Sequence, residues 1–185
     1  MQDNQALTHA ASLGTVFTVY AVPADFATLT AIRQHSLVES LKSLSADLPQ
    51  GLGILDSLQA LASFAKSQAA TKVVATRAHD TSGMLEQSEL AELLYGEGIA
   101  LELVGSNYAV EPGTIAKDDG SPLKVYTPFY KRWIQAGWER PYALDVQGAS
   151  WGKSHGVGNY PVPSGPAPFQ IKAGEAFALR TFARF

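Results

Sequence analysis

Short runs of β-branched and aromatic residues recur along the first part of the chain, separated by polar residues, glycine and proline. The clearest run is Thr15–Val22, which lies between Gly14 and Pro23 and is typical of a buried strand. Further strands are expected at residues 51–55, 72–76 and 99–104, the first of these being the weakest. Helix-length segments separate the runs, and this alternation predicts an α/β fold with a parallel sheet and helices on both faces.

The segments between the runs carry apolar residues at helical spacing. In Leu29–Leu48 a stripe of leucines precedes Pro49, which cannot continue a helix. The other helices are expected to carry Ala6 to Ala11, Leu58 to Ala65, and Gly83 to Tyr95. Short polar side chains satisfy the free N–H groups of a first turn, so the expected caps are Asp3 or Asn4, Asp56 or Ser57, and Asp80 or Ser82.

An aromatic segment, Gly120–Trp133, follows the last expected strand. A helix is expected at or just after Pro128, because proline biases the preceding residue toward an extended conformation. Tyr126, Phe129 and Trp133 then share one side of the helix. We expect these rings to be buried as a clamp on the edge of the domain, with Lys131 and Arg132 facing solvent or a second domain. The alternative is that the segment forms part of a ligand site.

Past Trp138 the composition changes to glycine, proline and serine, and Gly148–Pro168 has the character of an extended linker. A short helix is expected within residues 173–185, with Phe182 on its apolar face and nothing after it to pack against. The predicted organisation is an α/β domain over residues 1–140, a linker over 141–172 and the first helix of a further domain over 173–185.

Composition narrows the possible functions. The chain has 185 residues, 46% of them hydrophobic, which suits one domain with a sizeable core. Because there is no cysteine, disulfides, thiolate catalysis and cysteine metal sites are excluded. The net charge is −3 and no dense basic run exists, so the chain alone is not expected to bind nucleic acid. No apolar run spans a membrane and no signal peptide is evident, so the expected location is cytoplasmic.

Several common active-site patterns are incomplete in this chain. Gly51 and Gly53 lack the third glycine of a dinucleotide-binding loop. Ser154 and His155 lie in the expected linker, which we take to be flexible, with no acid placed beside them for hydrolase chemistry. The four histidines lack the spacing of metal ligands, so no metal site and no catalytic residue are predicted.

Five segments, in the same order and with compatible spacing, resemble the N-terminal α/β domain of the DNA photolyase/cryptochrome family. The segments are Asp3–Leu7, His35–Leu41, Tyr108–Ile115, Gly120–Trp133 and, more loosely, the helix that begins at Gly174-Glu175. The resemblance implies a Rossmann-like sheet whose first strand lies in its middle. That strand has no counterpart here, since Met1 already stands at its end, which implies a start assigned too late or a decayed gene.

The resemblance also implies what lies outside this chain. In the family, a helical domain after the linker holds FAD, the electron-relay tryptophans and the groove for damaged DNA. Trp133, Trp138 and Trp151 belong to the domain edge and linker, so they are not assigned to the relay. The family's α/β domain holds a second, antenna chromophore, which is a folate, a deazaflavin or a flavin.

The loop that corresponds to the antenna site is Thr76–Gly83. The resemblance makes Arg77, His79 and Asp80 the candidate cofactor-binding residues. Asp80 occupies the acidic position and is able to accept hydrogen bonds from a pterin-like ring, while His79 replaces the usual aromatic residue. Arg77 departs from the family's usual polar residue, and Glu86-Gln87 replaces an Arg-Asp pair. The alternative for Asp80 is the helix cap already described.

The implied function is that of the light-harvesting N-terminal domain of a photolyase, which splits pyrimidine dimers with light-excited reduced FAD. Two alternatives stay open: a cryptochrome-type blue-light photoreceptor, and a stand-alone module that binds a nucleotide or a chromophore. Damaged DNA is an expected partner only through the helical domain. No membrane partner is expected.

Overall fold

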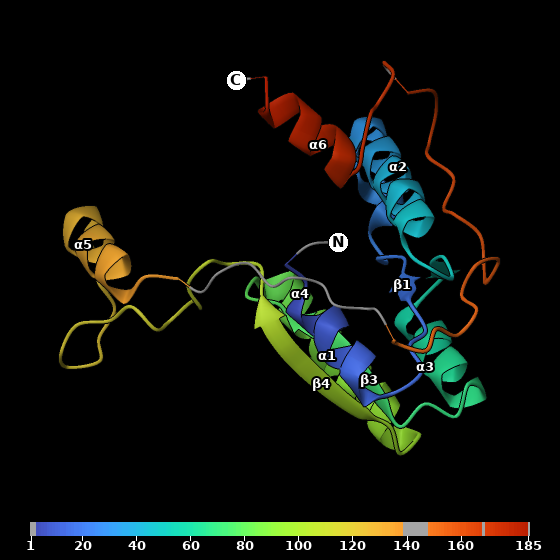
Figure 1. Cartoon of the computed structure of the whole chain (residues 1–185), viewed down its shortest axis with the longest axis horizontal. Helices are drawn as coiled ribbons and strands as arrows, with labels where there is room; N and C mark the ends of the chain where they lie inside the picture. The colour runs from blue at the N-terminus through green and yellow to red at the C-terminus, as the bar shows by residue number, and fades with distance from the viewer. Residues whose placement is uncertain (1–2, 139–147, 168, 185) are drawn as a thin grey trace.

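The computed structural model describes residues 3–138, 148–167 and 169–184 (Figure 1). In chain order its elements are α1 (Gln5–Leu13), β1 (Val19–Ala21), the short 3₁₀ helix η1 (Phe26–Thr28), α2 (Ala31–Asp47), β2 (Gly53–Leu55), α3 (Leu58–Ser67), β3 (Lys72–Arg77), α4 (Thr81–Gly96), β4 (Ala100–Ser106), α5 (Tyr126–Ala136) and α6 (Glu175–Phe182). The helices and strands expected from the sequence are all present, with ends that differ by a few residues.

Polar caps set where three of these helices begin. The Asn4 side chain accepts from the Leu7 N–H at 2.8 Å at the start of α1. The Ser57 hydroxyl accepts from the Ala60 N–H at 3.1 Å at the start of α3, and Asp80 caps α4. Each cap therefore comes from one of the residues expected for it, because a short side chain there replaces the hydrogen bond that a first turn lacks.

The strands form two parallel pairs, β1 with β2 and β3 with β4. The α/β class and the parallel pairing are confirmed, but the expected single sheet is divided. No strand in the described part of the chain lies between β1 and β3. This division is what the family resemblance implies, because the strand without a counterpart would lie between these two.

Side chains alternate between the two faces of each pair. Leu55 of β2 and Leu101 of β4 join one hydrophobic cluster, which α3 and α4 build with buried residues such as Leu94. On the opposite face, Ile54 of β2 packs with α2, and Glu102 of β4 contacts α1. In Figure 1, α1 accordingly lies on one side of β3 and β4, with α4 on the other side. Helices therefore cover both faces, as the sequence predicts.

Helix α5 stands away from the two strand pairs in Figure 1. The expected burial of Tyr126, Phe129 and Trp133 is wrong, because α5 buries no residue. Tyr126 is 73% exposed and Phe129 38% exposed. The rings of Tyr126, Tyr130, Trp133 and Trp138 instead stack on one another, with successive centroids 5.6, 6.5 and 5.0 Å apart. The aromatic face is real, but its rings cover each other rather than a domain edge.

The start of α5 also differs from expectation. The helix begins at Tyr126, two residues before Pro128. Proline is tolerated in this first turn because the backbone N–H that it lacks would have no partner within the helix there. Arg132 does not simply face solvent: its guanidinium donates to the Ala116 carbonyl and, at 2.8 Å, to Asp118. This pairing holds the loop before α5 against the helix.

The expected linker and the final helix are partly described. Residues 139–147, Pro168 and Phe185 lie outside the described residues, so the boundary expected at 140–141 stays a prediction. Residues 150–165 are hydrogen-bonded to the segment before β1, to β2 and to α2, so this part of the expected linker lies against the α/β domain. Helix α6 begins at Glu175 after Gly174 and buries none of its described residues.

Candidate functional site

The carboxyl ends of β3 and β4 place the candidate residues. Arg77 is the last residue of β3, and its guanidinium donates to the Leu103 carbonyl of β4 at 3.3 Å. The Arg77 Nε atom lies 3.8 Å from Glu111 Oε1, in the loop after β4. Because neighbouring parallel strands end at the same edge, the loops that follow them meet here.

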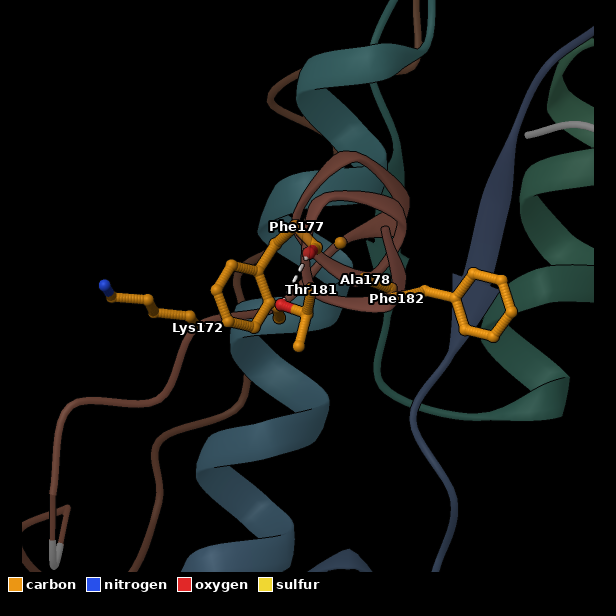
Figure 2. Close-up of a pocket in the computed structure, with 7 residues that line it drawn as sticks. Lys172, Phe177, Ala178, Thr181 and Phe182 are labelled. Atoms are coloured by element: carbon orange, nitrogen blue, oxygen red, sulfur yellow. Dashed lines mark hydrogen bonds between the residues drawn. The ribbon is translucent and has the colours of Figure 1, made fainter. Parts of the chain in front are cut away.

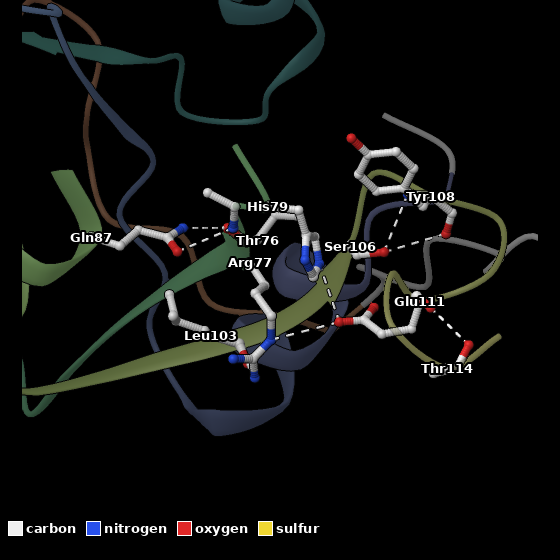
Figure 3. Close-up of polar contacts among 10 residues, drawn as sticks. Thr76, Arg77, His79, Gln87, Leu103, Ser106, Tyr108, Glu111 and Thr114 are labelled. Atoms are coloured by element: carbon white, nitrogen blue, oxygen red, sulfur yellow. Dashed lines mark hydrogen bonds and ion pairs between the residues drawn. The ribbon is translucent and has the colours of Figure 1, made fainter. Parts of the chain in front are cut away.

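His79 lies between Arg77 and the loop after β4 (Figure 3). Its Nε2 atom is 3.2 Å from Glu111 Oε1, and its ring packs edge-on against Tyr108 with centroids 5.6 Å apart. The imidazole is largely buried, yet Nε2 has no partner with hydrogen-bond geometry among the described residues. The cluster thus combines a guanidinium, a carboxylate, an incompletely paired imidazole and an exposed phenol ring.

Asp80 is not part of this cluster but caps the start of α4. Its Oδ1 atom accepts from the Gly83 N–H at 2.9 Å and caps α4. In the same turn, the Gln87 side chain accepts from the Ala78 N–H at 3.1 Å and donates to the Thr76 carbonyl at 2.7 Å. Asp80 and Gln87 therefore hold the loop in shape, while Arg77 and His79 extend toward Glu111.

Sequence reasoning did not assign Tyr108 and Glu111 to the site. Both lie in the Tyr108–Ile115 segment, which was used only for the family resemblance. The available signal was topological: this segment follows the strand expected next to the one that ends at Arg77. Two parallel strands in adjacent positions bring their following loops together, so the second loop was a candidate as soon as the first was chosen.

Two hollows lie elsewhere on the molecule. One, of about 500 Å³, lies along α6, and its lining includes Lys172, Phe177 and Phe182 (Figure 2). The other, also about 500 Å³, lies between α5 and the loop before it, beside Asp118 and Arg132. Neither contains a residue of the Arg77–Glu111 cluster.

The described residues were also searched for metal ligands and membrane spans. Within residues 3–138, 148–167 and 169–184, no three histidine, aspartate or glutamate side chains gather as a metal site would require. No helix in these same ranges has the length and apolar character needed to cross a membrane.

The family model described as DNA photolyase matches residues 1–145. This chain belongs to the DNA photolyase family. The deoxyribodipyrimidine photo-lyase of Agrobacterium fabrum is 28% identical over 149 residues, which cover 77% of this chain and 31% of that protein. The family expected from five short segments is therefore confirmed.

Solved structures of the photolyase family share the fold. A class III photolyase from Agrobacterium tumefaciens superposes with a TM-score of 0.69 at 23% identity, over 84% of this chain and 34% of its own. A cryptochrome from Synechocystis sp. PCC6803 superposes with a TM-score of 0.72 at 17% identity, over 82% of this chain and 35% of its own. An archaeal photolyase from Sulfolobus tokodaii superposes with a TM-score of 0.64 at 12% identity, over 82% of this chain and 35% of its own. The chain thus spans about a third of the length of these photolyase-family relatives.

Proposed function

We propose that this chain is the N-terminal light-harvesting α/β domain of a DNA photolyase. The match of the family model to residues 1–145 carries the proposal, and the photo-lyase relative supports it. The whole protein would split pyrimidine dimers with light-excited, reduced FAD in a helical domain beyond α6. A cytoplasmic location, with access to DNA, is part of the same proposal.

The antenna chromophore is proposed to lie at the carboxyl ends of β3 and β4. The Sulfolobus tokodaii photolyase was solved with two FAD molecules, which implied a novel light-harvesting cofactor in that protein. In this chain, Arg77 and Glu111 would supply a donor and an acceptor to a flat heterocycle. His79 Nε2 would gain the partner that it lacks, and the exposed ring of Tyr108 would provide a stacking surface. When bound, this group would absorb light and pass the energy to the catalytic flavin.

A titration tests the antenna proposal on the chain itself. The purified chain is mixed with a folate, a deazaflavin and FAD in turn, and binding is followed by absorbance and fluorescence. We expect one of them to bind, and His79→Ala and Arg77→Ala to weaken that binding. His155→Ala and Arg33→Ala, at exposed positions away from the cluster, serve as matched controls. Equal binding by all four variants would place the site elsewhere.

A second assay tests the assignment to a photolyase. The 185-residue chain covers about a third of its relatives, so we expect it to repair no DNA under blue light. A longer protein from the same locus, with the helical domain attached, is expected to convert thymine dimers in an oligonucleotide to thymines. Dimer repair by the 185-residue chain alone would overturn the domain assignment.

Cryptochrome function is the second candidate, since the structure superposes well on the Synechocystis protein, with a TM-score of 0.72. The same repair assay separates the two functions. A longer protein that undergoes flavin photoreduction but leaves dimers intact would favour the photoreceptor.

A further inference from the structure

Residues 150–165 run along the molecule as an extended segment, here called the strap. In Figure 1 the orange trace passes β1 and α3, rises beside α2 and leads to α6. Four backbone hydrogen bonds of 2.7–2.9 Å tie the strap to the α/β body: Val16 N–H to the Ser150 carbonyl, Gly152 N–H to the Val16 carbonyl, His155 N–H to the Gln50 carbonyl, and Ile54 N–H to the Val157 carbonyl. The strap thus occupies the outer edge of β2.

Ser154 makes the first buried attachment. The residue is 0% exposed, and its Oγ accepts from the Thr18 N–H at 3.0 Å. Its own N–H donates to the Gln50 carbonyl at 3.2 Å. If the Ser154 hydroxyl were removed with the strap in place, the part-buried Thr18 N–H before β1 would lose its partner, and a donor left covered and unpaired is costly. The hydroxyl therefore couples the position of the strap to the start of the sheet.

Gln34 of α2 makes the second buried attachment between the strap and the α/β body. It is 1% exposed, and its side-chain amide donates to the Phe26 carbonyl at 3.0 Å and to the Leu29 carbonyl at 2.9 Å. Its Oε1 accepts from both the N–H and the hydroxyl of Ser164, at 2.6 and 3.0 Å. One buried side chain thus joins the turn before α2 to the far end of the strap.

Two glycines bring the strap and α6 unusually close to the body. A Cβ on Gly158 would lie 1.6 Å from the Ile54 carbonyl oxygen, and a Cβ on Gly174 would lie 2.0 Å from the Ser43 hydroxyl of α2. Both glycines have positive φ angles, at 68° and 100°. Backbone conformation favours glycine at both positions, and at Gly158 the nearby backbone carbonyl also leaves no space for a side chain. Gly174 is the N-cap residue of α6, so the start of this helix lies close to α2.

We propose that the strap is locked rather than flexible, and that Gln34 and Ser154 are positioning residues that set where α6 stands relative to the sheet. Helix α6 buries none of its described residues, so burial of its own side chains contributes little to holding it. We therefore attribute its placement mainly to the strap and to the contact at Gly174. Energy transfer between two chromophores falls steeply with their separation, so the lock would hold the light-harvesting domain at a fixed distance from whatever follows α6. That consequence rests on the proposed function, whereas the lock does not.

Distance measurement on the chain itself tests the lock without any chromophore. The sequence has no cysteine, so Glu89→Cys on α4 and Arg180→Cys on α6 provide two unique, exposed sites for spin labels. With the labelled chain diluted in an excess of unlabelled chain, so that distances between associated chains do not contribute, we expect one narrow distance distribution by pulsed electron paramagnetic resonance. Gln34→Leu should broaden that distribution, and Gln59→Leu, at an exposed position on α3, should not. A broad distribution in the unsubstituted background would overturn the proposal.

Hydrogen exchange gives an independent measurement. The amides of Ser164 and His155 should exchange about tenfold faster in Gln34→Leu, because each lost buried hydrogen bond lowers the local opening energy. Ser154→Ala should accelerate exchange at Thr18 and His155, while Ser150→Ala, at an exposed position of the same strap, should have no effect. Unchanged exchange in both Gln34→Leu and Ser154→Ala would overturn the proposal.

Hydrogen exchange at the amides of α3 and α4 shows whether a variant has lost the fold as a whole or only the attachment of the strap. If Gln34→Leu also removes their protection, the milder Ser164→Ala decides, since it deletes only the 3.0 Å hydroxyl contact with Gln34. Faster exchange confined to the strap in Ser164→Ala supports the lock, and unchanged exchange there contradicts it. A chain that binds no chromophore would contradict the proposed antenna function and leave these results unaffected.

Discussion

His79 Nε2 is the one buried side-chain polar atom that the described residues leave without a hydrogen-bond partner. The Glu111 oxygen lies 3.2 Å away, which is close enough for an ion pair, but the two groups do not form a hydrogen bond. Such atoms are uncommon in folded proteins, and either a water molecule or a ligand can complete the pairing. The neighbouring residue, Asp80, has its partner already. Asp80 is therefore assigned to the helix cap, and the proposed ligand contact is left to its neighbour His79.

Asp80→Ala tests this separation. We expect the free energy of unfolding to fall by about 0.5–2 kcal/mol, because the Gly83 N–H at the start of α4 loses its cap. Chromophore binding should be unchanged in the folded fraction. Urea unfolding and the absorbance titration measure the two effects, with the exposed Asp56→Ala as the matched control. Normal stability with lost binding would instead make Asp80 a ligand-binding residue.

Glu102 predicts a dependence of stability on pH. Hydrogen bonds from Lys72 and His9, the Lys72 contribution being larger, lower the pKa of the Glu102 carboxyl below its ordinary value of 4.5. The unfolded chain therefore takes up this proton at a higher pH than the folded chain does. The stabilisation from Glu102 is fully present above pH 4.5 and is lost as the pH falls through the lowered pKa.

Urea unfolding across a series of acidic pH values measures this effect. Glu102→Gln should flatten the loss of stability in acid, whereas the exposed Glu92→Gln should keep the slope of the unsubstituted chain. The same slope in both variants would mean that the contacts of Glu102 with Lys72 and His9 do not stabilise the fold.

At the scale of elements, the local signals in the sequence were sufficient for the helices. Asn4, Ser57 and Asp80 cap the helices they were expected to cap, because capping depends only on residues three positions away. The surroundings of an element were harder to predict. The spacing of aromatic residues in α5 identifies a shared face, but it does not say whether anything covers that face. Likewise, nothing in the pattern of α2 indicates that Gln34 is buried and paired with a serine far along the chain.

Two leucines of α4 test how burial within one helix sets stability. Leu94 is 0% exposed within the cluster between α3 and α4, and Leu85 is 67% exposed. Leu94→Ala should lower the free energy of unfolding by about 2–5 kcal/mol, through lost burial and the cavity left behind. Leu85→Ala should change it by no more than about 0.5 kcal/mol. Similar values for both, measured by urea unfolding, would contradict the orientation of α4.

Helix α5 carries a related prediction. Since Tyr126 is 73% exposed, Tyr126→Ala should change the free energy of unfolding by no more than about 0.5 kcal/mol. A loss similar to that of Leu94→Ala would restore the original interpretation, in which this ring clamps the edge of the α/β domain.

At the scale of the whole molecule, two strand pairs share one core. Val19 and Ala21 of β1 pack against the same cluster as Val73 and Leu101 of β3 and β4. On either side of β1, the Thr18 carbonyl and the Val22 N–H both bond to β2, so the backbone groups of Val19 and Ala21 point away from it. By the same alternation, the Thr71 carbonyl faces β4 and the backbone of Val74 faces away. Two edges that the described residues leave unpaired therefore border one hydrophobic cluster, an arrangement that exposes strands to pairing with other chains.

An added strand tests this arrangement. We expect an apolar, β-branched segment joined ahead of α1 to pair with both edges, because α1 is then the crossover helix of a β–α–β unit that ends in β1. The extended chain should melt at a higher temperature and stay monomeric, and the amides of Val19, Ala21 and Val74 should become protected. An extension of equal length built from lysine and serine is the control, and it should leave all three properties unchanged. The 185-residue chain itself is expected to associate with itself and to protect these amides poorly. Cooperative melting of a monomer with strong protection at residues 19–21 and 72–77 would show instead that the two pairs are complete as they stand.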